Sequence, residues 1–238
     1  MNIKVMSYNI RSCIGMDNQV DPKRLADFLL SCDADIVGLQ EVSSDHPYLP
    51  GVDQLAVLEK ETSWKGFFAQ TLSRAREGGL FCYGIGILTR LSCEKIAQIA
   101  LPNVENCEPR TAIILKVEKD GEYFYFVNTH LAYEEHLGDL RVKQLACIED
   151  YVREQNLFPA VITGDFNDTP TSPCLEEMQK EWLFTDLEKL TFPSDIPAIK
   201  IDYIGFTPKD AFTFRDYKVI EEKVISDHRP LTVILEKK

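Results

Sequence analysis

Short hydrophobic runs rich in Val, Ile, Phe and Tyr recur along the chain, separated by turns that contain Gly, Pro, Asn or Asp. Runs of this length and composition predict β-strands. The sequence Lys119-Asp120-Gly121 between two of the runs predicts a tight hairpin turn. The expected strands cover residues 3–9, 35–41, 67–72, 83–89, 96–101, 111–118, 122–129, 201–206, 211–220 and 231–235, with a further buried strand that begins at residue 160.

Helical periodicity is confined to a few segments. Asp21-Pro22 provides an N-cap and a first-turn proline ahead of apolar residues at helical spacing, which predicts a helix over 22–32. Residues 139–154 carry apolar side chains on one face and predict an amphipathic helix. Two shorter helices are expected at 54–61 and at 173–180.

The stretch from Ala160 to Pro170, AVITGDFNDTP, combines a buried strand with unexpected polarity. Its apolar, branched residues end at Gly164, and Asp165 follows at once. A carboxylate at the mouth of a packed strand is costly unless a metal ion or a cationic group neutralises it. The alternative is an aspartate that forms a turn and caps the following segment.

Length and charge limit the possible functions. The 238 residues are 45% hydrophobic, enough for a full core, and no linker, repeat or low-complexity segment divides them. We therefore expect a single domain over residues 1–238. Lys and Arg number 26 against 38 Asp and Glu, a formal charge of −12. This balance disfavours a protein that grips nucleic acid without regard to sequence, because the phosphate backbone would be repelled.

The cysteines favour a reducing compartment. Seven of them are scattered along the chain with no Cys-x-x-Cys pair, which disfavours a zinc knuckle or a redox motif. The N-terminal MNIKVMSYNI lacks the long apolar segment of a signal peptide, and no later run is long enough to span a bilayer. We expect a cytoplasmic protein without a membrane segment. The sequence predicts no particular oligomeric state.

Several expected strands carry, at or near one end, a polar residue that can bind metal or move a proton. These residues are Asn9, Glu41, His130, Asp165, Asn167, Asp202, Asp227 and His228. A sheet that exposes its strand ends on one rim would gather them into one cleft. Oxygen donors dominate the set, and they suit Mg²⁺ or Mn²⁺. A hard divalent ion held by carboxylates can polarise a phosphate ester, and a nearby imidazole can take a proton from the attacking water. Together these groups can hydrolyse a phosphate ester.

Each residue also has an alternative explanation. Asn9 would cap a turn, Glu41 would join a buried salt bridge, and Asp202 would pair with an arginine. His46 and His136 lie in polar surroundings and are expected to be solvated loop residues. The ordered set of residues, rather than any one of them, favours the metal site.

The same set resembles the endonuclease/exonuclease/phosphatase superfamily, which includes pancreatic-type deoxyribonucleases, abasic-site endonucleases, neutral sphingomyelinases, inositol-polyphosphate 5-phosphatases and deadenylases. Six motifs occur in the family's order and span nearly the whole chain. They are Ser7-Tyr8-Asn9, Leu39-Gln40-Glu41-Val42, Asn128-Thr129-His130-Leu131, Gly164-Asp165-Phe166-Asn167, Ile201-Asp202-Tyr203-Ile204 and Ser226-Asp227-His228-Arg229-Pro230. Residues 84–90 and Pro109-Arg110 also resemble family positions.

The resemblance implies an α/β fold, a four-layer sandwich in which two mixed β-sheets lie face to face with helices outside. It also implies a role for each matching residue. Glu41 would be the direct Mg²⁺ ligand, with Asn9 and Asp227 ligating or orienting bound water. Asp165 and Asn167 would position the attacking water and the phosphate, and Asp202 would orient His228. His130 would contact phosphoryl oxygens or help protonate the leaving group, and Arg110 would contact the scissile phosphate or form a surface salt bridge.

The resemblance leaves the substrate open. The lead hypothesis is a Mg²⁺-dependent phosphodiesterase or phosphatase that acts on a small or soluble phosphoester. The runner-up is a DNA-repair-type endonuclease or exonuclease, and an alternative from a different class is a catalytically silent binding scaffold. Segments 44–65, 73–82 and 132–138 are expected to be loops that line the cleft and select the substrate. The sequence does not distinguish one bound ion from two. It also does not distinguish Asp165 from His228 as the residue that activates water.

Overall fold

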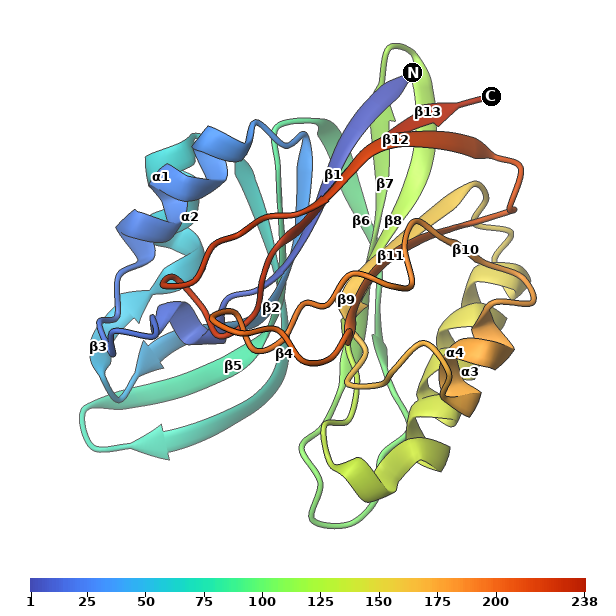
Figure 1. Ribbon diagram of the computed structural model, residues 1–238. Coiled ribbons are helices and arrows are strands. Elements are labelled where there is room, and N and C mark those ends of the chain that lie inside the picture. Colours follow the sequence, from blue (N-terminus) through green and yellow to red (C-terminus); the bar gives the residue numbers. More distant parts are fainter.

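Two β-sheets lie face to face between two pairs of helices in the computed structural model, which describes residues 1–238 (Figure 1). The strands are β1 (Asn2–Asn9), β2 (Ile36–His46), β3 (Leu49–Asp53), β4 (Lys65–Arg76), β5 (Gly79–Thr89), β6 (Ser92–Ala100), β7 (Thr111–Lys119), β8 (Glu122–His130), β9 (Ala160–Asp165), β10 (Leu183–Phe184), β11 (Asp202–Thr207), β12 (Phe212–Val219) and β13 (Leu231–Lys237). The α-helices are α1 (Pro22–Cys32), α2 (Gln54–Thr62), α3 (Gly138–Glu154) and α4 (Pro173–Met178), and the 3-10 helices are η1 (Arg11–Cys13) and η2 (Glu135–Leu137).

Three hydrophobic clusters hold the layers together. The first sheet has the order β12-β13-β1-β2-β5-β4, with β3 paired to β2, and the second has the order β10-β11-β9-β8-β7-β6. One cluster fills the space between the sheets. A second joins α1 and α2 to the first sheet, and a third joins α3 and α4 to the second sheet. The result is the expected four-layer α/β sandwich of two mixed sheets.

Each sheet contains one parallel pair, and both pairs are joined by a helix. β1 pairs in parallel with β2 across α1, and β8 pairs in parallel with β9 across α3. The first crossover helix has the predicted bounds: the Asp21 side chain accepts from the backbone N–H of Arg24, and the chain leaves the helix at Asp33 with φ 49°. Because parallel strands run in one direction, the carboxyl ends of each pair lie at the same edge of their sheet.

A buried polar network links the two sheets near that edge. Asn128 Nδ2 in β8 donates to the carbonyl oxygens of Leu39 and Gly86 in the opposite sheet, at 2.9 Å each. Its Oδ1 accepts from Gln40 Nε2 at 2.7 Å. Gly38 lies against this network, where any Cβ would collide with the side chains of Asn128 and Thr163. The glycine therefore allows the close approach of the two sheets.

The expected strands and helices are present, but three segments differ from expectation. The segment 73–82, expected to be a loop, is the far part of a hairpin in which β4 and β5 pair from Lys65–Thr89 to Arg76–Gly79. The segment 44–65 contains the edge strand β3, which was not expected, ahead of α2, which matches the helix predicted over 54–61. The two-residue strand β10 was not expected, because its pairing with β11 depends on residues far along the chain. None of the helices is long and apolar enough to cross a membrane.

Candidate active site

Strand ends from both sheets meet at one rim of the sandwich. Asn9 ends β1, and Glu41 lies in β2 where that strand leaves its parallel partner. In the other sheet, His130 and Asp165 end β8 and β9 as a directly paired couple. The remaining members arrive on antiparallel neighbours: Asp202 begins β11 opposite Asp165, while Asp227 and His228 lie just before β13. The structure thus brings the predicted set to one place.

Asn9 joins the two sheets at this rim. Its Nδ2 donates to Glu41 Oε1 and to Asp165 Oδ2, at 3.0 Å each. Glu41 has φ 59°, and the pairing of β2 with β5 shifts register between Leu39 and Val42. A bulge of this kind changes the direction in which a side chain points, and here it lies at the position of Glu41.

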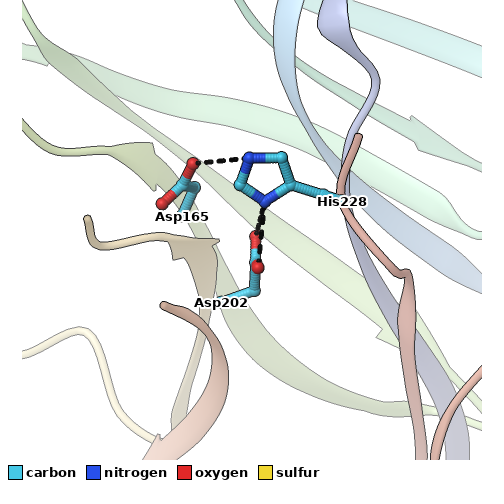
Figure 2. A group of neighbouring side chains, drawn as sticks. All are labelled: Asp165, Asp202 and His228. Atoms are coloured by element: carbon cyan, nitrogen blue, oxygen red, sulfur yellow. Dashed lines mark hydrogen bonds and ion pairs between the residues drawn. The ribbon is translucent and has the colours of Figure 1, made fainter. Parts of the chain in front are cut away.

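Asp202 and His228 form a hydrogen-bonded pair, and Figure 2 shows Asp165 on the other side of the imidazole ring. His228 Nδ1 lies 3.1 and 3.0 Å from the two carboxylate oxygens of Asp202. His228 Nε2 lies 3.6 Å from Asp165 Oδ2. Because a carboxylate can only accept, Nδ1 carries a proton and donates it to Asp202. The pairing with an arginine considered for Asp202 is therefore absent.

His130 approaches Asp165 from the neighbouring strand β8 of the same sheet. Its Nε2 lies 3.5 Å from Asp165 Oδ2, and its Nδ1 lies 3.2 Å from Arg110 Nη1. Arg110 is itself buried and forms an ion pair of 2.6 Å with Glu108. The salt bridge considered for Arg110 exists, but it lies inside the site rather than on the surface.

Asn167 and Asp227 are held by local hydrogen bonds. The backbone N–H of Asn167 donates to Asp165 Oδ1 at 2.9 Å, and its side-chain amide donates to the carbonyl oxygen of Leu131. Ser226 Oγ donates to the carbonyl oxygen of Asn9 at 2.7 Å, which fixes the loop that carries Asp227. Asp227 remains partly exposed.

Sequence reasoning did not assign Arg11 to the site. Its backbone N–H donates to Asn9 Oδ1 at 3.1 Å, and its Nε lies 3.5 Å from Asp227 Oδ2. Arg11 begins η1, and three consecutive residues from Arg11 to Cys13 have positive φ. No spacing rule identifies such a turn. The one available signal is that Arg11 follows the Ser7-Tyr8-Asn9 motif by two residues.

The two other histidines lie outside this cluster. His136 is an exposed residue of η2, as expected. His46 differs from expectation, because it ends β2 and is half-buried against the rings of Phe81 and Tyr48. It lines a cavity of 270 Å³ that also contains Glu41.

Burial and close charges perturb the titrating groups of the site. Burial raises the pKa of Glu41. Burial also raises the pKa of Asp165, and the neighbouring charge of Asp202 raises it further. Burial, Arg110 and His228 together hold the pKa of His130 well below its usual range. For His228, burial opposes the charged form, but the carboxylates of Asp202 and Asp165 outweigh it and raise the pKa.

The residues present fit a divalent cation. Raised pKa values at Glu41 and Asp165 mark buried carboxylates whose charge a cation would offset. The ligand atoms of Asp165, Asp202 and His228 lie within 4.8 Å of one another. Asp202 already accepts from His228, however, whereas Glu41 accepts a single hydrogen bond at one oxygen. Glu41 therefore has more free acceptor capacity for a metal than Asp202 has.

Comparisons with known proteins agree with this architecture. One structure, of an endonuclease/exonuclease/phosphatase from Beutenbergia cavernae, matches with a TM-score of 0.77 and 23% identity over 99% of this chain and 72% of that one. Another, from Bacteroides vulgatus, has a TM-score of 0.76 and 21% identity over 100% of both chains. A mannosyl-6-phosphatase from Bacteroides thetaiotaomicron has a TM-score of 0.75 and 19% identity over 98% of this chain and 99% of that one. No curated protein sequence matches.

The sequence itself identifies the family. A model of the endonuclease/exonuclease/phosphatase family matches residues 6–228, which include five of the six motifs in full and the sixth, Ser226-Asp227-His228-Arg229-Pro230, as far as His228. The matched range begins in β1 and ends at His228. It therefore contains every residue of the rim cluster, which consists of Asn9, Glu41, His130, Asp165, Asn167, Asp202, Asp227 and His228. The chain therefore belongs to the endonuclease/exonuclease/phosphatase family of phosphoester hydrolases.

Proposed function

We propose that residues 1–238 form one catalytic domain that hydrolyses a small or soluble phosphoester with the help of Mg²⁺, for which Mn²⁺ can substitute. One observation carries the proposal. Asp165 Oδ2 lies 3.0 Å from Asn9 Nδ2, 3.5 Å from His130 Nε2 and 3.6 Å from His228 Nε2. A carboxylate, an amide and two imidazoles thus converge on one point, as hydrolysis by an activated water requires.

Each residue has a role in this proposal. Glu41 would hold the metal, and Asn9 and Asp227 would ligate it or orient the water beside it. The bound ion supplies a positive charge that polarises the phosphoryl group. Asp165 and Asn167 position the attacking water and the phosphate, and the proton of that water passes to Asp165 or to His228.

The remaining groups act on the phosphate and on the imidazole. Asp202 fixes the tautomer of His228 through Nδ1 and keeps Nε2 directed toward Asp165. His130 contacts phosphoryl oxygens or protonates the leaving group, and Arg110 adds positive charge behind it.

Two structural neighbours carry names that point to phosphoester chemistry. One is a mannosyl-6-phosphatase, and another is the human Nocturnin catalytic domain, whose structure holds a bound sulfate anion. These names support phosphoester hydrolysis as a class. All seven cysteines are free thiols, and this supports a reducing location such as the cytoplasm.

The test is hydrolysis of bis(p-nitrophenyl) phosphate with Mg²⁺ or Mn²⁺, set against an EDTA control. We expect metal-dependent turnover that falls by on the order of a hundredfold or more in Asp165→Asn. The exposed Asp210→Asn variant is the matched control, because Asp210 lies in the turn before β12 and should retain wild-type rates. A protein that binds metal but shows no turnover of any phosphoester in a broad panel would instead be a binding scaffold.

A further inference from the structure

A cavity of 270 Å³ opens directly beside Glu41, and nothing in the proposed mechanism uses its far wall. Glu41 and Arg11 contribute the side nearest the rim cluster. The far wall consists of the β4–β5 hairpin together with the end of β2. Its lining residues include His46, Arg74, Phe81 and Tyr83. The cavity is therefore continuous with the proposed metal site and large enough to hold a ring attached to the phosphate.

The register of the hairpin explains how these side chains share one face. Arg74 is paired directly with Phe81, and Leu72 is paired directly with Tyr83. Directly paired residues of antiparallel strands project on the same side, and so do residues two apart on one strand. The four hairpin side chains therefore project from one side, and all of them line the cavity: Leu72, Arg74, Phe81 and Tyr83.

The aromatic residues form a connected surface. The ring centroids of Phe81 and Tyr83 are 6.4 Å apart, and those of Phe81 and His46 are 5.6 Å apart. Phe81 and His46 are half-buried, so part of each ring stays open to the cavity. A partly exposed aromatic surface inside a cavity is suited to contact with the face of a ring or with the apolar face of a sugar.

Arg74 is exposed, and it is the one arginine of the ten in this chain whose side chain forms neither a hydrogen bond nor an ion pair. The contrast with Arg76, two residues later on the same strand, is direct, because Arg76 is paired with Asp45. In a chain with 38 acidic against 26 basic residues, carboxylates are abundant, yet none forms an ion pair with Arg74, although its charge acts on the nearby Glu108 carboxyl and favours a lower pKa there. The nearby carboxylate of Glu108 is engaged with Arg110 instead. A free guanidinium in a cavity is a ready partner for an anion.

We propose that Arg74 binds a second anionic group of the substrate, and that the hairpin face holds the ring between this group and the scissile phosphate. The substrate class is then a phosphoester whose esterified group contains a ring and a further anionic group such as a second phosphate. This inference rests on the proposed function, because it takes the scissile phosphate to lie at Glu41. It also explains how a protein of charge −12 attracts a doubly anionic substrate: the positive charge is local to the cavity.

The activity test compares two 4-nitrophenyl esters of thymidine 5′-phosphate, one with a 3′-phosphate and one with a 3′-hydroxyl. Both release 4-nitrophenolate, so the ratio of their kcat/KM values measures the contribution of the second anion. We expect the wild type to prefer the 3′-phosphate, and Arg74→Gln to reduce this preference about tenfold, mainly through KM, as expected for a charge-assisted hydrogen bond. The Arg153→Gln control changes the net charge equally at an exposed position of α3 and should keep the wild-type ratio.

A binding measurement separates this inference from the proposed function. Calorimetry with thymidine 3′,5′-bisphosphate and thymidine 5′-phosphate, in the presence of Mg²⁺, needs no turnover. A wild-type preference for the bisphosphate that Arg74→Gln removes would support the subsite even if neither ester were hydrolysed, in which case only the proposed function would fall. Equal wild-type affinity for the two ligands, or equal losses for both in Arg74→Gln, would overturn the subsite and leave hydrolysis untouched.

Discussion

Asp202 and His228 show at the residue scale what the sequence can predict and what it cannot. Each lies near the end of an expected strand, so the sequence predicts both as rim residues. The partner of Asp202 was open to an arginine, because β11 belongs to one sheet and His228 precedes β13 of the other. The packing of the two sheets decides the matter, since it brings His228 Nδ1 within 3.0 Å of Asp202 Oδ2.

This pair predicts non-additive losses of activity. Asp202→Asn should lower kcat on bis(p-nitrophenyl) phosphate about tenfold or more without abolishing metal binding, because it removes the negative charge beside the ring and replaces one acceptor oxygen with an NH2 donor, which favours the wrong tautomer of His228. His228→Ala should lower kcat further. The double variant should lose little beyond His228→Ala, since residues that act as a unit are not additive. If the measured losses multiply in the double-mutant cycle, the two side chains act separately.

Glu149 on α3, away from the rim, gives a prediction for stability. Burial and the charges of Glu177 and Glu181 raise its pKa to about 7, and its Oε1 is buried without a hydrogen-bond partner. The folded state therefore binds more protons than the unfolded state between pH about 4.3 and pH about 7, so stability falls as pH rises through this window.

Replacing Glu149 with Gln should remove that loss. At pH about 8 we expect Glu149→Gln to raise the free energy of unfolding by about 1–2 kcal/mol, a figure that allows for the solvent exposure of part of the side chain. Near pH about 4 the difference should largely disappear. Urea unfolding at several pH values measures it, with Glu94→Gln on the exposed edge strand β6 as the control. A pH-independent difference would rule out titration of Glu149 as its cause.

At the scale of elements, hydrophobic runs located the strands of the core better than the strands of the edge. Core strands such as β7 and β8 are buried on both faces and read as nearly continuous apolar runs. The outer part of the β4–β5 hairpin is exposed and rich in polar residues, so its sequence resembles a loop although its backbone is fully paired. The edge strand β3 contains Pro50 and Gly51, which the sequence indicates as a turn.

Asn128 gives a prediction for the junction of the two sheets. Its replacement by Ala would remove the side-chain donor to the buried carbonyl oxygens of Leu39 and Gly86, and it would leave Gln40 Nε2 with only its 3.4 Å hydrogen bond to Ser7 Oγ. We expect Asn128→Ala to lower the free energy of unfolding by about 3 kcal/mol. Urea denaturation measures this change, with the exposed Asn103→Ala as control. A loss below about 0.5 kcal/mol, the range of ordinary surface substitutions, would show that the network is dispensable.

At the scale of the whole molecule, the four layers followed from a family resemblance and not from the pattern of strands alone. The alternation of strands and helices predicts an α/β class, but it does not say that the strands divide into two sheets. Six separate motifs supplied that information, and they also identified the rim residues. The sequence predicts that segments 44–65 and 73–82 line the cleft, and His46, Arg74 and Phe81 from these segments line the cavity beside Glu41. The way in which β2, the hairpin and η1 combine around this cavity could not be predicted, because these elements are far apart in sequence.

The net charge predicts a preference between substrates. At −12, the protein would bring acidic surface toward the phosphate array of duplex DNA, whereas a small phosphoester needs only the rim groups and the cavity. We expect faster turnover of small phosphoesters than of undamaged plasmid DNA at about 0.15 M salt, where charges act over about 8 Å. Plasmid nicking, abasic-site cleavage and small-diester hydrolysis are measured side by side. Efficient DNA cleavage that is lost in Glu41→Gln would favour the DNA-repair-type endonuclease.

The central claim is that strand ends from two sheets form one divalent-metal site with Glu41 as its ligand. Calorimetric titration of Mg²⁺ into the wild type, Glu41→Gln and the Glu94→Gln control tests it most directly. Because Glu41→Gln removes a charged oxygen ligand while keeping the shape of the side chain, we predict affinity weakened by about tenfold or more in that variant alone. Equal Mg²⁺ affinity in the wild type and in Glu41→Gln, with both proteins folded, would contradict the claim.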